Sequence, residues 1–156
     1  MTPKQATSSN RGKPLSLEHA LYLSLQRLAS ELHQETAELF KEAGLSAPQF
    51  NILRILRGAG EGGLPCNDIS ERLIARAPDM TRLLDRMEQQ GLVTRNRSEV
   101  DRRIVAARIT EAGLALLAGL DAPLLNLHQQ QFAPLGEEKL ARLLELLEAA
   151  RAKPQP

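Results

Sequence analysis

The chain has 156 residues, of which 42% are hydrophobic and 25% are charged, and its formal net charge is +1. This length fits one compact domain, and the composition excludes a disordered chain and a membrane-spanning one. The single cysteine excludes an intrachain disulfide, and with three scattered histidines it offers no metal-ligand cluster, so we expect neither metal nor cofactor. Residues 1–15 are polar and lack the apolar core of a secretory signal, which predicts a disordered arm on a cytoplasmic protein without membrane contact.

Two helices are predicted in the first third of the chain. Leucines at steps of three and four residues predict a long amphipathic helix over 16–43, which ends at a glycine. A shorter helix is predicted to begin after Ser46, because serine caps helix N-termini, and Pro48 suits its first turn. Gly58 and Gly60 end this second helix.

The middle of the chain predicts two further helices followed by a hairpin. Apolar side chains recur at helical spacing up to Gly91. Beyond this glycine the pattern changes to that of two strands, which flank the polar run NRSEVDRR as an exposed tip. The predicted segments are helices over 67–75 and 78–90 and strands over 92–94 and 104–110.

The C-terminal third predicts two leucine-rich helices over 111–152, separated at Pro134 and Gly136, with Pro123 as a candidate break in the first. Together with the helix over 16–43, they carry more leucine than a monomer of this size buries. This surplus predicts a homodimer built from the terminal helices. The expected fold class is therefore mainly α with a small antiparallel β-hairpin, in one continuous domain whose central lobe spans 44–110.

The basic residues of the central lobe are all arginines. Nine arginines and seven acidic residues lie between Leu64 and Thr110, and no lysine occurs from Glu42 to Glu138. A guanidinium offers a planar fork of donors, which suits phosphates and base edges better than an ammonium does. The alternative on charge alone is a solvated face of surface arginines. Aromatic residues make up only 3% of the chain, which disfavours a protein that stacks unpaired bases.

Two helices joined by a tight turn and followed by a charged hairpin are the element order of a winged helix-turn-helix, whose second helix enters the major groove of double-stranded DNA. Arg82, near the start of that helix, has the geometry to bind guanine with its fork of donors. Arg86 is expected to contact phosphate or to pair near Asp85, and Asp79 to cap the helix and orient an arginine. The candidate groove-facing residues off the apolar stripe are Asp79, Thr81, Arg82, Asp85 and Arg86.

The segments IARAPDMTRLLDRMEQQGLVTR and DRRIVAARITEAG, at this spacing, resemble the recognition helix and wing of the MarR family of bacterial transcription regulators. The resemblance covers Gly44 to Gly113. It implies an obligate homodimer that binds a pseudo-palindromic operator and usually represses transcription. It also implies a small phenolic or aromatic ligand that releases the DNA.

The resemblance further implies roles for particular residues. In the wing, Asp101 would pair with Arg103 and steady it for entry into the minor groove, while Arg97 and Arg102 would contact phosphates or the neighbouring groove. The chain departs from the family pattern at Ile74, where glycine is frequent, and at Arg76, where a serine or threonine cap is usual. The candidate effector pocket is formed by Tyr22, Arg27, Phe50 and Arg54.

Three alternatives accompany this interpretation. A winged-helix dimer whose leucine-rich surface binds proteins is one, and a redox-sensing regulator is another. The redox alternative depends on Cys66, which lies at a predicted helix N-terminus where the helix dipole lowers a thiol pKa; otherwise Cys66 is an inert small residue. The third alternative, an enzyme, finds no nucleophile elbow, phosphate loop or zinc-protease motif in the sequence. We therefore expect no catalysis.

Overall fold

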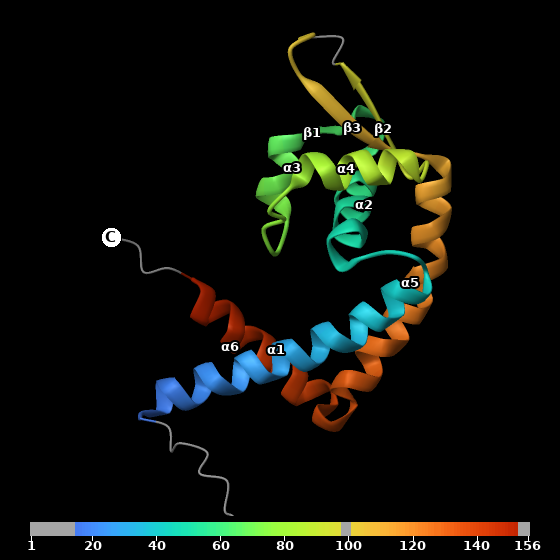
Figure 1. Cartoon of the computed structure of the whole chain (residues 1–156). Helices are drawn as coiled ribbons and strands as arrows, with labels where there is room; N and C mark the ends of the chain where they lie inside the picture. The colour runs from blue at the N-terminus through green and yellow to red at the C-terminus, as the bar shows by residue number, and fades with distance from the viewer. Residues whose placement is uncertain (1–14, 98–100, 153–156) are drawn as a thin grey trace, which may run out of the picture. The chain divides into compact units, whose positions relative to one another are not determined.

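The computed structural model describes residues 15–97 and 101–152, so the predicted N-terminal arm lies almost entirely outside the described residues. The described chain is mainly helical, with a small antiparallel sheet (Figure 1). It divides into two compact units within the first helix, one ending at Gln34 and the other beginning at Glu35. The elements are α1 (Leu17–Glu42), α2 (Ala47–Ala59), η1 (Gly60–Gly62), β1 (Leu64–Pro65), α3 (Cys66–Arg72), α4 (Met80–Gln89), β2 (Val93–Arg97), β3 (Val105–Ile109), α5 (Glu111–Phe132), η2 (Ala133–Leu135) and α6 (Gly136–Arg151).

The core of the second unit is built around α2. Ser46 caps this helix as predicted: its hydroxyl accepts a hydrogen bond from the Gln49 backbone N–H, and the Gln49 side chain accepts one from the Ser46 N–H in return. Each large apolar side chain buried here contributes about 1.5–3 kcal/mol. The largest fully buried side chains are Ile52, Leu53, Leu56, Ile69, Leu84, Met87, Val93 and Leu117.

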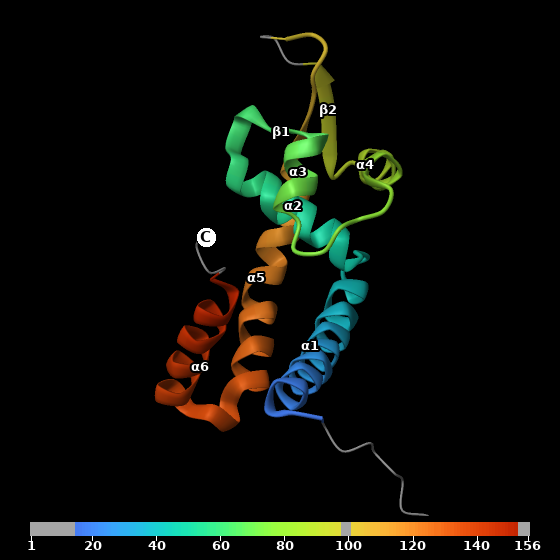
Figure 2. The same cartoon turned by 90° about the vertical axis from the view of Figure 1, so that its left-hand side faces the viewer.

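The sheet has three strands in the order β1-β3-β2, all antiparallel. The predicted hairpin is confirmed, with Val93 opposite Ile109 and Arg97 opposite Val105. The third strand, β1, was not predicted, because two residues are too few to show an alternating pattern. Figure 2 shows the hairpin projecting beyond α2, α3 and α4. We call β2, β3 and the residues between them the wing.

Two predicted helix boundaries in the helix-turn-helix are wrong. The first helix ends at Arg72 rather than Ala75, because Leu73 has extended backbone angles. In this conformation the Leu73 side chain packs against the core. Ile74 therefore lies beyond this helix and is 82% exposed. The second helix begins at Met80 rather than Pro78, because Asp79 is its N-cap.

Pro123 does not break α5, which runs without interruption from Glu111 to Phe132. A proline inside a helix removes one backbone hydrogen bond and strains the turn before it. Here that cost is offset by packing on both sides of the proline, where Leu120 is buried and Leu124 packs against the core. No helix among residues 15–97 and 101–152 combines the length and apolarity needed to cross a membrane.

Candidate nucleic-acid interface

The recognition helix α4 begins at a charged cap. The Arg82 backbone N–H donates a hydrogen bond to Asp79 Oδ1 at 3.1 Å, and Arg82 Nε lies 3.4 Å from Asp79 Oδ2. Asp79 therefore caps the helix and orients an arginine, as the sequence predicted. The Arg82 side chain is 88% exposed, so its remaining donors face solvent.

The helix α4 separates its apolar and polar side chains cleanly. Leu84 and Met87 are buried beneath it, while Thr81, Arg82 and Arg86 are exposed. These three residues, all candidate DNA contacts, thus share the solvent-facing surface of one helix, which is the arrangement that a major-groove helix requires.

Asp85, a candidate groove-facing residue, is engaged in an ion pair within the protein, although its side chain is 47% exposed. Its carboxylate oxygen Oδ1 lies 2.5 Å from Nη2 of Arg95, on the neighbouring strand β2. The same Arg95 nitrogen lies 2.7 Å from Glu88 Oε2, and Arg95 Nε donates a hydrogen bond to that oxygen at 3.1 Å. We call Asp85, Glu88 and Arg95 the Arg95 clamp. It joins the recognition helix to the wing.

The Arg95 clamp makes stability depend on pH. Hydrogen bonds from Arg95 hold the pKa of Glu88 below its usual 4.5. A lowered pKa stabilises the fold above the unfolded-state value, and the stabilisation is lost as pH falls through the folded-state value. We therefore expect the difference in unfolding free energy between wild type and Glu88→Gln, measured by urea titration, to be constant above about pH 6 and to shrink below 4.5. A difference that grows on acidification would contradict the clamp.

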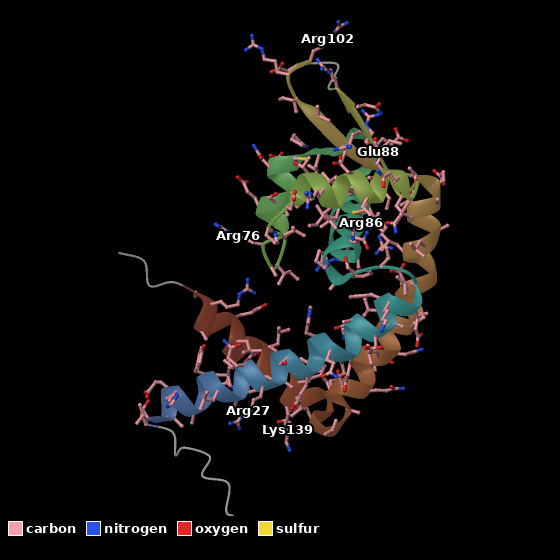
Figure 3. All side chains as sticks on the ribbon, viewed as in Figure 1. Arg27, Arg76, Arg86, Glu88, Arg102 and Lys139 are labelled. Carbon is pink, nitrogen blue, oxygen red and sulfur yellow. The ribbon has the colours of Figure 1, made fainter. Side chains whose placement is uncertain are left out.

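The wing carries the other candidate DNA contacts. Arg97 is exposed at the end of β2. Arg102 and Arg103 are exposed just before β3 begins at Val105. Figure 3 shows Arg102 at the end of the wing that is distant from α4. Asp101 Oδ1 accepts a hydrogen bond from the Arg103 backbone N–H at 2.9 Å, so Asp101 shapes the turn that presents Arg103. The remaining tip residues, 98–100, lie outside the described residues.

Thr110 joins the wing to α5. Its hydroxyl donates to the Gly91 carbonyl at 2.7 Å and accepts from the Gly113 N–H at 3.1 Å, so one side chain caps α5 and holds the turn after α4. Gly113 lies so close to this turn that an added Cβ would stand 2.6 Å from the Leu92 carbonyl oxygen. In the sequence TEAG, the threonine is therefore the cap of α5 and the glycine is the point of close contact with the turn. The sequence alone indicated only the start of a helix.

Gln49 is a second structural residue that the sequence analysis missed. It is 5% exposed, and its Nε2 donates a hydrogen bond to Gln90 Oε1 at 3.1 Å. The capping pattern at Ser46 was the only sequence signal for its local role. Its contact with Gln90, 41 residues away, ties the start of α2 to the end of the recognition helix.

The candidate effector residues lie in both units. Tyr22 and Arg27 are exposed on α1, in the first unit. In the second unit, Arg54 is exposed on α2, whereas Phe50 is buried and stacks on Phe40 with ring centroids 4.2 Å apart. Phe50 is thus a core residue of α2.

Cys66 is half-buried as the first residue of α3, and the expected direction of its pKa shift is wrong. Burial raises the pKa of the Cys66 thiol, and this outweighs the opposing charge of Arg95. At neutral pH the thiol is therefore protonated and a poor nucleophile. Within the described ranges, no three histidine, cysteine or acidic side chains converge as a metal site; His19 and His33 lie fourteen residues apart on α1, and His128 lies on α5.

The pair α3 and α4, followed by the wing, defines a winged helix-turn-helix protein. The model of the MarR family matches residues 45–105. Over 147 residues, the chain is also 33% identical to the organic hydroperoxide resistance transcriptional regulator of Bacillus subtilis, covering 92% of this chain and 98% of the relative. The chain therefore belongs to the MarR family, and it is a transcription regulator rather than an enzyme.

Two further proteins support this placement. The chain is 32% identical over 124 residues to the transcriptional repressor IacR of Pseudomonas putida, covering 80% of this chain and 73% of the relative. The crystal structure of a MarR transcription factor from Planctomyces limnophilus is 39% identical, with a TM-score of 0.67, and the match covers 86% of this chain and 97% of that one.

Proposed function

We propose that this regulator is a sequence-specific repressor that binds double-stranded operator DNA as a homodimer in the cytoplasm. The observation that carries the proposal is that arginines on α4 and on the wing face solvent, while Leu84 and Met87 of α4 and Val93 and Ala107 of the wing are buried. The similarity to a named repressor of Pseudomonas putida supports the direction of regulation.

In this proposal the helix α4 lies in the major groove and the wing follows the adjacent minor groove. Arg82 contacts a guanine edge, because Asp79 holds its guanidinium at the N-terminal end of the helix, where recognition helices approach the bases. Thr81 and Arg86 contact a base or phosphate on the same face. Arg103 enters the minor groove, with Arg97 and Arg102 on the flanking phosphates.

The homodimer follows from apolar side chains that the single chain leaves exposed. They lie on α1, α5 and α6, the predicted dimerisation helices, and a second copy would bury them. Two recognition helices related by a two-fold axis require a pseudo-palindromic operator with half-sites about one helical turn apart. The exposed residues are Leu17, Leu21, Leu25, Leu28, Leu125, Leu140, Leu144 and Leu146.

Release from DNA by a small aromatic or phenolic ligand completes the proposal. Tyr22 and Phe50 supply the aromatic residues of the candidate pocket, and Arg27 and Arg54 supply cations for a carboxylate or phenolate. Since Phe50 is closed in the core against Phe40, the ligand would contact it only after that stack opens. Such a ligand should weaken operator binding and raise the melting temperature of the free protein.

Gel retardation with the intergenic DNA beside the protein's own gene tests this function. We expect Arg82→Ala to weaken binding by roughly 1–3 kcal/mol, which is about 5-fold to 150-fold, and to relax one base preference. Arg103→Ala should weaken binding and reduce the slope of log affinity against log salt.

Arg142→Gln is the matched control, because Arg142 is an exposed arginine paired with Glu145 on α6. It should leave binding unchanged. Unchanged binding by both DNA-lobe variants would refute the placement of the interface. Weak binding of the wild type that modest salt abolishes would instead favour a protein-interaction module.

A further inference from the structure

We infer that Arg95 is a positioning residue, which sets the angle between the recognition helix and the wing and thereby the offset between their two contacts on the operator. The inference rests on the proposed function. Arg95 is one of nine arginines between Leu64 and Thr110, and nothing in the sequence separates it from the candidate DNA contacts.

Two of the three guanidinium nitrogens of Arg95, and its backbone N–H, are engaged within the protein. Nε and Nη2 both bond Glu88 Oε2, Nη2 also bonds Asp85 Oδ1, and the Arg95 backbone N–H donates to Glu88 Oε1 at 3.2 Å. The side chain is only 23% exposed, against 88% for Arg82. Charge-assisted bonds of this kind are directional, so they fix orientation as well as proximity. Arg95 therefore acts on DNA through the elements that it joins.

The Arg95 clamp spans the corner between α4 and β2. At this corner Gly91 has a φ of +72°, and the backbone hydrogen bonds Gly91 N–H to Glu88 O and Leu92 N–H to Met87 O hold only the last turn of the helix. The clamp reaches further back, to Asp85. The ion pair between Arg95 and Asp85 thus restrains rotation of β2 relative to α4 about Gly91.

The wing extends well beyond the clamp. Arg95 lies opposite Ala107 in the middle of the hairpin, and Arg97 and the tip follow it. Arg97, two residues further along β2, lies about 7 Å from Arg95 along the strand, so a rotation of about 10° at the clamp moves Arg97 by about 1 Å and the more distant Arg102 and Arg103 by more. A shift of that size breaks a hydrogen bond. Small angular freedom at Arg95 would therefore misplace Arg102 and Arg103 in the minor groove.

The lobe does not depend on the clamp to fold. Leu92 and Val93 are buried at the same corner, and the Thr110 hydroxyl holds the Gly91 carbonyl. The two carboxylates are 47% and 40% exposed, so water can solvate them when Arg95 is removed. Loss of the clamp should free the wing angle in a folded protein.

The test uses full-length protein and a duplex that the wild type selects from a random-sequence pool. A second duplex keeps the selected half-sites but replaces A·T pairs with G·C in the flanking minor groove. We expect the wild type to favour the first duplex, and Glu88→Gln to reduce that flank preference at least 5-fold while keeping the base preferences within the half-sites. A charge effect alone would give a different result, because removing a negative charge near DNA would by itself strengthen binding to both duplexes.

Two further variants separate positioning from direct contact. Arg95→Gln should behave like Glu88→Gln, and the double variant Glu88→Arg with Arg95→Glu should recover part of the flank preference. Arg142→Gln should match the wild type.

Several outcomes would overturn the inference: an unchanged flank preference in Glu88→Gln, a parallel loss of flank and half-site preferences, or no flank preference in the wild type. An effect confined to Arg95→Gln, with a salt slope lower by about one, would assign Arg95 a direct phosphate contact instead. If the wild type enriches no duplex from the pool, the proposed function itself fails.

Discussion

Gly63→Ala is expected to lower the free energy of unfolding by about 3–5 kcal/mol. Gly63 has a φ of +66° and a ψ of −169°, a conformation that side chains rarely adopt. An added Cβ would also overlap the Ala107 carbonyl oxygen on β3 and stand 2.6 Å from Cγ of Arg108. The overlap arises because β1 follows Gly63 directly and pairs with β3. Urea unfolding followed by circular dichroism measures the loss.

Gly60→Ala is the matched control for this prediction. Gly60 has nearly the same backbone angles, with a φ of 69° and a ψ of −157°, but an added Cβ would meet open space. Gly60→Ala should lower the free energy of unfolding only by the cost of the unfavourable backbone conformation, about 1–3 kcal/mol. Equal losses in the two variants would show that β1 and β3 do not pack as closely as the structure indicates.

Gly113→Val is expected to destabilise the protein by about 3 kcal/mol or more. The first atom of the new side chain would lie 2.6 Å from the Leu92 carbonyl oxygen and 2.7 Å from Cγ1 of Ile109. The backbone oxygen cannot retreat easily, because it accepts a hydrogen bond from Thr110. The variant should therefore push α5 away from the turn that follows α4.

Gly58→Val supplies the comparison, because Gly58 is an exposed helical glycine of α2 with open space around it. Valine has a slightly better helix propensity than glycine, so this variant should be within about 0.5 kcal/mol of the wild type. The same urea titration measures both proteins. A small effect at Gly113 would argue against the close contact between α5 and the α4–β2 turn.

The helices and their caps could be predicted because their causes are local. Ser46 caps α2 through bonds to Gln49 three residues away, and Asp79 caps α4 through Arg82 at the same spacing. Period and cap chemistry therefore located these elements to within about two residues. The hairpin was predictable for a similar reason, since its two strands flank one polar run.

The features that escaped prediction depend on distant partners. Arg95 looks like the other arginines of the lobe until the fold places Asp85 and Glu88 around it. The strand β1 exists only because β3 lies beside it, and burial of the leucines around Pro123 offsets the cost of that proline. Such tertiary packing outweighs local propensity, which is why the candidate break at Pro123 does not occur.

The three-stranded sheet gives the helix-turn-helix two attachments to a single strand. The chain enters α3 from β1 and leaves α4 into β2, and both strands pair with β3. The recognition helix is thus part of a chain segment that both begins and ends beside β3, and the Arg95 clamp restrains its exit at Gly91. The strand β3 then passes into α5 through Thr110 alone. A tilt of α5 would therefore act first on β3, and through the two strands that pair with β3 it would reach both ends of the helix-turn-helix.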